Sequence, residues 1–308
     1  MSGMLNLSKR NIKMYLRDYA SVFFSVLSML IVLALMVIFL GKMNCENVVD
    51  ALAQFGGVRD AAVDEKNAAY LIQMWTLAGI LEVNAVTITL TVMGIMVQDE
   101  AKGRLASFYL TPVRKIQIAL GYITASWFVG TVMCTLTLAA GELYMAVCGH
   151  PLLDAAAWMK LIGMIALNTL VYASLSYLLA LFIHSESAWN SIFTIIGTLV
   201  GFVGAIYLPM AMLPDGVSSV LKCLSVLHGA AMMRKICTAD AIAKTFDGLP
   251  SAAGASFCEQ MGVTVKIQHQ GTSTEILLYQ QILFLMICAI IAVAVSVLVI
   301  RRRRLRDR

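Results

Sequence analysis

Long apolar segments alternate with short polar ones along almost the whole chain. Two of the apolar segments are each interrupted by a single acid, Glu82 in one and Glu142 in the other. A membrane core about 30 Å thick requires about 20 apolar residues in a helix that rises about 1.5 Å per residue, and every segment reaches that length. The six segments are residues 19–41, 67–98, 116–153, 161–183, 187–214 and 276–300.

The apolar residues in these segments are continuous, which favours helices. A membrane-spanning strand would instead alternate at a period of two over about ten residues. The sequence therefore predicts an all-α integral membrane protein, with six transmembrane helices in a single domain over residues 1–308. The spans are expected near residues 20–40, 76–97, 117–147, 159–183, 189–213 and 279–300.

Composition excludes a soluble protein. Of the 308 residues, 60% are hydrophobic and only 13% are charged, and the mean hydropathy is +0.82. Soluble domains carry about 25% charged residues, so this chain has roughly half the charge that a water-facing surface of its size requires.

Basic residues concentrate at three places, and these places define an orientation. With six spans all three lie on one side, which the positive-inside rule identifies as the cytoplasm. Both termini of this multi-pass protein are therefore expected in the cytoplasm, at the cell (plasma) membrane. The clusters are Lys9, Arg10, Lys13 and Arg17; Lys102, Arg104, Arg114 and Lys115; and the arginines at 301–304, 306 and 308.

Residues 214–278 are then a long external loop, and its first part has apolar residues at helical spacing. This pattern predicts either a helix that re-enters the outer leaflet or a helix packed under an external cap. A short strand is expected where Val263, Val265 and Ile267 alternate with polar residues. The residues at helical spacing are Val217, Val220, Leu221, Leu224 and Leu227.

The first 19 residues are expected to form an amphipathic interfacial helix. Its four basic residues share one face, and an apolar, tyrosine-bearing face lies opposite. Such a helix lies in the membrane plane with its basic side chains toward anionic lipid, or it serves only as a topology anchor. The apolar face comprises Leu5, Ile12, Tyr15, Leu16 and Tyr19.

The cytoplasmic loop 98–116 contains a helical pattern that a passive connector would not need. Leu105, Phe108 and Tyr109 fall at i, i+3 and i+4, which gives a short helix with one apolar face that Pro112 ends. The acids Asp99 and Glu100 are expected near its N-terminus, where the helix dipole favours them. The apolar face indicates docking against another protein, or packing on the chain's own bundle.

This loop resembles the first cytoplasmic loop of type 2 ABC transporter permeases, the ABC-2 family. The resemblance rests on an acidic pair, then Lys-Gly-Arg-Leu, an apolar turn, Thr-Pro-Val and a return into the membrane near residues 118–123. In that family the loop is a coupling helix seated in a groove of the ATP-binding subunit. By resemblance, the coupling residues are Asp99, Glu100, Gly103, Arg104, Leu105, Phe108, Tyr109, Thr111 and Pro112.

The resemblance implies the permease subunit of an exporter, in which this chain forms a homodimer or pairs with a paralogous permease. The chain contains no Gly-x-x-x-x-Gly-Lys-Ser/Thr motif, so ATP and Mg would be bound on a partner ATPase subunit. We therefore expect no enzyme activity and no cofactor or metal on this chain. The C-terminal arginines follow a span directly, which indicates contact with lipid headgroups and no nucleic-acid partner.

Two further groups of residues are candidates within the spans. Glu82 is expected about 9 Å inside the outer end of its span, where it lines a translocation path with Asn84, Thr87 and Thr91, or has a structural role. Glycines spaced about four apart favour close helix packing, either between subunits, which the resemblance favours, or within one. These glycines are Gly197, Gly201 and Gly204.

Two other functional classes compete with an ATP-driven exporter. A secondary transporter without ATP would use Glu82 for proton coupling, but the chain shows neither two repeated halves nor mid-membrane helix breaks. An integral membrane enzyme would need several catalytic polar groups at one depth, and neither Glu82 nor Glu142 has such neighbours in the sequence. The permease interpretation ranks first.

Overall fold

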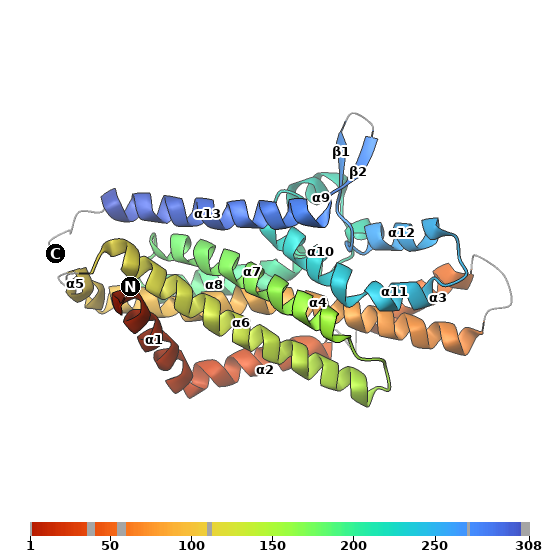
Figure 1. Ribbon diagram of the computed structural model, residues 1–308, viewed down its shortest axis with the longest axis horizontal. Coiled ribbons are helices and arrows are strands. Elements are labelled where there is room, and N and C mark those ends of the chain that lie inside the picture. Colours follow the sequence, from red (N-terminus) through yellow and green to blue (C-terminus); the bar gives the residue numbers. More distant parts are fainter. Residues whose placement is uncertain (1, 36–40, 54–59, 110–112, 270–271, 303–308) are drawn as a thin grey trace.

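The computed structural model describes residues 2–35, 41–53, 60–109, 113–269 and 272–302. They form an elongated helical bundle in which α1 begins and α13 ends beside α5 (Figure 1). We call this the α5 end, and the opposite end, which carries α3, α11 and α12, the far end. The long elements are α1 (Ser2–Arg17), α2 (Tyr19–Leu35), α3 (Gly41–Ala53), α4 (Ala61–Ala101), α6 (Lys115–Val147), α7 (Ala155–Ala180), α8 (Glu186–Val203) and α13 (Leu278–Arg302).

Four of the six expected spans are helices long and apolar enough to cross a membrane. Within the described residues these are α4, α6, α7 and α13. The expected first and fifth spans correspond to α2, with 17 described residues, and α8, with 18. The membrane crossing of α2 and α8 stays a prediction, and the end of the first expected span, residues 36–40, lies outside the described part.

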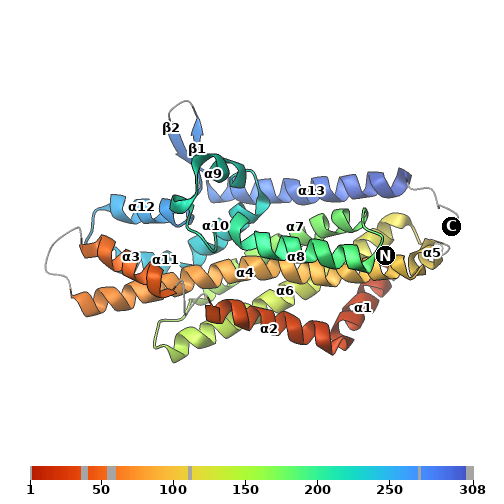
Figure 2. The ribbon, with the colours of Figure 1, turned by 180° about the vertical axis from the view of Figure 1, so that it is seen from behind.

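Helix α4 is the centre of the bundle. It packs against α6, α7, α8 and α10, and Figure 2 shows α8 and α2 lying along it. In its most apolar 18-residue stretch 78% of residues are buried, against 22% for α13. Large apolar side chains are instead exposed on α6 and α13, for example Leu136 and Ile290, as expected of surfaces that face lipid.

Helix α4 is longer than the expected span. The helix begins at Ala61, fifteen residues before the expected start at Thr76, and its 41 residues extend about 61 Å. Glu82 therefore lies near the middle of α4, about 32 Å from its first residue. Its depth of about 9 Å within the membrane span stays a prediction, because the helix extends beyond the apolar segment that defines the span.

Helix α8 is shorter than the expected span 189–213. It ends at Val203, and Gly204 caps it. Ala205 has a positive φ of 50°, which a right-handed helix does not allow. A single 3-10 turn follows, η2 (Met210–Met212), directly after Pro209. The apolar run 204–213 is therefore a compact reversal of the chain, which hydropathy alone could not distinguish from helix.

The expected external loop is mostly helical, and one of its helices enters the bundle. Helix α10 packs against α4, α7 and α13, whereas α11 packs against α4. The expected single helix is divided in two: Leu221 and Leu227 are buried, but Val217 and Val220 are exposed. The elements are α9 (Asp215–Leu221), α10 (Ser225–Cys237), α11 (Ala239–Thr245) and α12 (Ser251–Gln260).

A two-stranded antiparallel hairpin follows α12 and projects from the bundle (Figure 1). Strand β1 (Lys266–His269) pairs with β2 (Thr272–Glu275), with Lys266 opposite Glu275. The alternation at 263–267 thus indicated a real strand, shifted by a few residues. Apart from this hairpin, the regular elements of the described residues are helices, as expected of an all-α membrane protein.

Helix α1 presents three faces. One packs on α6 and buries Leu7, Asn11 and Tyr15. A second face exposes apolar side chains, including Leu16 at 55%, and the third carries exposed basic residues such as Lys13. Tyr15 was expected on the free apolar face, but it is 2% exposed because α6 covers it.

Candidate functional site

The chain reverses sharply at the α5 end. Helix α4 ends at Ala101, Gly103 has a φ of +70°, and α5 (Arg104–Tyr109) begins at the next residue. A positive φ is accessible to glycine without steric cost, which explains Gly103 in the predicted coupling segment. Asp99 and Glu100 belong to the last turn of α4. Their expected position in the short helix was wrong because α4 continues past the span.

Asp99 joins three helices at this reversal. Its fully buried carboxylate accepts two hydrogen bonds from Arg10 of α1, at 2.7 and 2.8 Å, and one from the Tyr122 hydroxyl of α6 at 2.7 Å. Arg104 of α5 lies 3.6 Å from the same carboxylate. These hydrogen bonds raise the pKa of the Arg10 guanidinium above its ordinary value. The buried charge is thus compensated by charge-assisted bonds.

The apolar face of α5 is turned largely toward its own chain. Leu105 is 5% exposed, and the Arg10 guanidinium lies over the Phe108 ring, 5.3 Å from its centroid. The burial of Leu105 agrees with the second expectation, packing on the chain's own bundle, because α5 packs against α4, and its role in coupling stays a prediction. Among the described side chains, those of Lys102, Arg104 and Ser107 are exposed, and the side chain of Tyr109 is outside the described part. Thr111 and Pro112 lie outside the described residues.

The turn between α7 and α8 contacts the same reversal. His184 lies 2.8 Å from the Glu100 carboxylate, and Lys102 lies 3.6 Å from Glu186. Ser185 caps α8 by accepting a hydrogen bond from the Ala188 amide. The two turns expected on the cytoplasmic side therefore form one polar surface at the α5 end.

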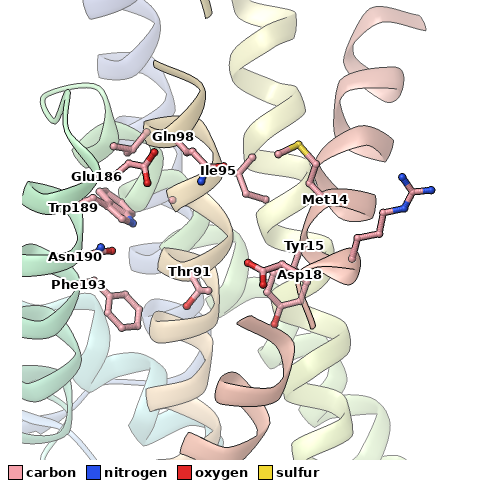
Figure 3. Close-up of a pocket in the computed structure, with 13 residues that line it drawn as sticks. Met14, Tyr15, Asp18, Thr91, Ile95, Gln98, Glu186, Trp189, Asn190 and Phe193 are labelled. Carbon is pink, nitrogen blue, oxygen red and sulfur yellow. The ribbon is translucent and has the colours of Figure 1, made fainter. Parts of the chain in front are cut away.

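A cavity of about 510 Å³ lies beside this surface, between α1, α4 and α8. Figure 3 shows the residues of α4 lying between those of α8 and those of α1. Its lining combines aromatic rings with polar side chains, the mixture typical of small-molecule sites. The lining residues are Met14, Tyr15, Arg17, Asp18, Thr91, Gly94, Ile95, Val97, Gln98, Glu186, Trp189, Asn190 and Phe193.

The four residues expected to line one path face different neighbours. Asn84 donates to the Thr137 hydroxyl of α6 at 3.2 Å. Thr87 lies opposite Gly197 of α8, and Thr91 lines the cavity. Both threonine hydroxyls donate to carbonyls of their own helix. Glu82 lies on the face of α4 opposite the other three, and because α6 and α8 occupy the space beside Asn84 and Thr87, only Thr91 of the four lines the cavity.

Glu82 is fully buried and bonded by α7. Its carboxylate accepts hydrogen bonds from the Asn168 amide, at 3.0 Å, and from the Tyr172 hydroxyl. Gly229 of α10 lies directly against it, so that an added Cβ there would overlap the carboxylate. No sequence pattern pointed to Asn168, Tyr172 or Gly229, because all three lie far from Glu82 along the chain.

Two of the three expected packing glycines contact their own chain. The space beside Gly201 is filled by Tyr207, and the space beside Gly204 by Ile206, both from the reversal after α8. For these two residues the structure favours the alternative of packing within one subunit, since the chain folds back over them. Beside Gly197, the one neighbour within the described residues is Thr87, 3.9 Å from the position that an added Cβ would take.

This chain is similar to one family of known proteins. A family model described as ABC-2 family transporter protein matches residues 51–298, which include α4 to α12 and nearly all of α13. No curated protein matches the chain.

Proposed function

Because the chain belongs to the ABC-2 family of transporter proteins, we propose that it is the permease subunit of an ATP-driven exporter. A separate ATP-binding subunit hydrolyses ATP and docks at the α5 end. The observation that carries this proposal is the convergence of α1, α4, α5 and α6 on Asp99. A displacement of α5 would be transmitted through Asp99 to α1, α4 and α6 together.

The proposed docking surface is polar. It comprises the exposed Lys102, Arg104 and Ser107 with the neighbouring turn at His184 and Glu186. Interfaces between separately folded proteins have a polar, solvent-accessible rim, and this surface fits such a rim. Asp99, Glu100, Gly103 and Leu105 support this surface from within by setting the position of α5.

The cavity is the proposed substrate site. It adjoins the docking surface through Gln98 and Glu186, and two of its walls are α4 and α8. A change in the position of α5 would alter the angle between α1 and α4 and hence the width of the cavity. The complete path would be enclosed by two copies of this chain, or by this chain and a paralogue.

The proposed topology has six spans, α2, α4, α6, α7, α8 and α13, with both termini in the cytoplasm of the cell membrane. Cys148 and Cys223 are exposed and would then lie outside. A membrane-impermeant maleimide applied to intact cells should label the wild-type chain more strongly than the Cys148→Ser, Cys223→Ser double variant, whose remaining external thiols, Cys45 and Cys258, are half-buried. A cysteine introduced at Lys102 should react only after permeabilisation, and labelling of it in intact cells would reject this topology.

Co-purification with an ATPase tests the function itself. The tagged chain should retain its ATP-binding partner, and vesicles that contain both should show flux that requires ATP. Flux that persists without ATP would favour the secondary transporter instead. That alternative requires a carboxylate with access to water, whereas Glu82 is enclosed by Asn168, Tyr172 and Gly229.

A further inference from the structure

Arg234, in the segment expected to be an external loop, is fully buried within the bundle. It lies on α10, and its guanidinium donates to the carbonyls of Gly204 at 3.0 Å, Ala205 at 2.7 Å and Gly262 at 3.2 Å. A buried arginine is costly unless its donors are satisfied. Three carbonyl partners from two separate segments therefore mark a specific arrangement.

Two of these carbonyls belong to the reversal that ends α8. The last carbonyls of a helix have no partner within the helix, and the helix dipole places partial negative charge there. Arg234 supplies both hydrogen bonds and a positive charge at this point. The premature end of α8 at Val203 is thus held by a side chain 30 residues further along the chain.

The same guanidinium fixes that end of α8 to α4. It lies over the Trp75 ring, 4.7 Å from the centroid, while the Trp75 indole donates to the Met261 carbonyl at 2.8 Å. The reversal also packs against the α4 backbone here: a Cβ added to Gly79 of α4 would lie 2.6 Å from the Ile206 side chain. Helices α4 and α8 are therefore joined near the far end of α8.

Glu82 extends this contact along α4. It lies seven residues after Trp75, two turns further along the same face of α4. Gly229 of α10 lies directly against its carboxylate, which accepts hydrogen bonds from Asn168 and Tyr172 of α7. Glu82 therefore joins α4 to both α10 and α7.

We infer that Arg234 is a positioning residue for transport, because it fixes the end of α8 to α4 so that the two cavity walls pivot about this point. Both helices line the cavity with their other ends, at Thr91 to Gln98 and Glu186 to Phe193. From Gly204 to Trp189 is about 22 Å along α8. The inference rests on the proposed role of the cavity in transport.

The test compares Arg234→Gln with Lys235→Gln. Lys235 is the next residue on α10, but it is exposed and paired with Glu275 at 2.9 Å. In vesicles with the ATPase subunit, Arg234→Gln should keep ATP hydrolysis while flux per ATP falls about tenfold. Lys235→Gln should leave both rates unchanged. Normal flux per ATP in Arg234→Gln would overturn the inference.

A distance measurement separates positioning from general loss of structure. Spin labels carried by unnatural amino acids at Lys102 and Ser187, both exposed, report the spacing of α4 and α8 at the α5 end. Their distance distribution should broaden in Arg234→Gln and stay narrow in Lys235→Gln. An unchanged distribution in Arg234→Gln would reject the pivot, whatever its flux.

One further variant and the independence of the distance measurement keep the test decisive. If Arg234→Gln does not fold, Arg234→Lys keeps the charge but loses the planar fork that reaches Gly204 and Gly262 together, and the same broadening is expected. The distance measurement needs no ATPase. If the wild type shows no ATP-driven flux, the proposed function fails while the pivot is still tested.

Discussion

Arg10 and Asp99 are 89 positions apart in the sequence and form a bidentate ion pair, with nitrogen to oxygen distances of 2.7 and 2.8 Å. The pair joins the N-terminal helix to the last turn of α4, immediately before the coupling segment. Asp99 is fully buried, whereas the Arg10 side chain is 30% exposed. This relationship makes the first helix part of the coupling structure, in addition to any contact it makes with lipid.

Removal of the Asp99 carboxylate should destabilise the α5 end. Asp99→Ala leaves Arg10, Arg104 and Tyr122 without their shared acceptor, and with Arg10 partly exposed we expect a loss of about 2 kcal/mol. Thermal unfolding in detergent measures this as a lower Tm. Lys9→Ala removes an exposed charge from α1, the helix of Arg10, and should leave the Tm unchanged. An equal Tm for Asp99→Ala and the wild type would contradict the structural role of the pair.

The surface of α5 should determine binding of the ATPase subunit. Ser107 is exposed, so Ser107→Arg should fold normally and yet reduce co-purification of the partner about tenfold through steric overlap at the interface. The matched control is Lys160→Glu, an exposed change at the start of α7, away from α5. Retention of the partner by Ser107→Arg at the wild-type level would place the docking surface elsewhere.

Filling the cavity should impair substrate binding more than coupling. Thr91→Leu places an apolar branch where a hydroxyl lines the cavity, so the KM for transport should rise severalfold while ATP hydrolysis without substrate stays constant. Thr198→Leu serves as control, because Thr198 is an exposed residue of α8 outside the lining. A KM that is equal in Thr91→Leu, Thr198→Leu and the wild type would remove the cavity from the substrate path.

The glycines of α8 should differ in their tolerance of a methyl group. Gly201→Ala would collide with the Tyr207 ring and should lower stability by about 1–3 kcal/mol, whereas Gly197→Ala meets Thr87 at an ordinary contact distance and should be nearly neutral. The comparison is made by thermal unfolding together with native mass spectrometry of the assembly. If Gly201→Ala instead separates the subunits without a change in Tm, the glycine packs between chains after all.

The sequence alone determined that the protein is a helical membrane protein, because the thickness of the membrane core sets the length and apolar composition of each spanning helix. The long apolar runs correctly located α4, α6, α7 and α13, and the motif around Gly103 led to the ABC-2 family, which the match over residues 51–298 confirmed.

Only the tertiary structure decided which buried charges meet. Asp99 with Arg10, Glu82 with Tyr172 and Arg234 with the end of α8 are all pairings of residues distant in the chain. Hydropathy assigned 204–213 to a span and Arg234 to an external loop, since it measures each segment's preference for lipid and not its contacts. In a low-dielectric interior a charge is stable only beside its partner, and the packing of the helices selects that partner.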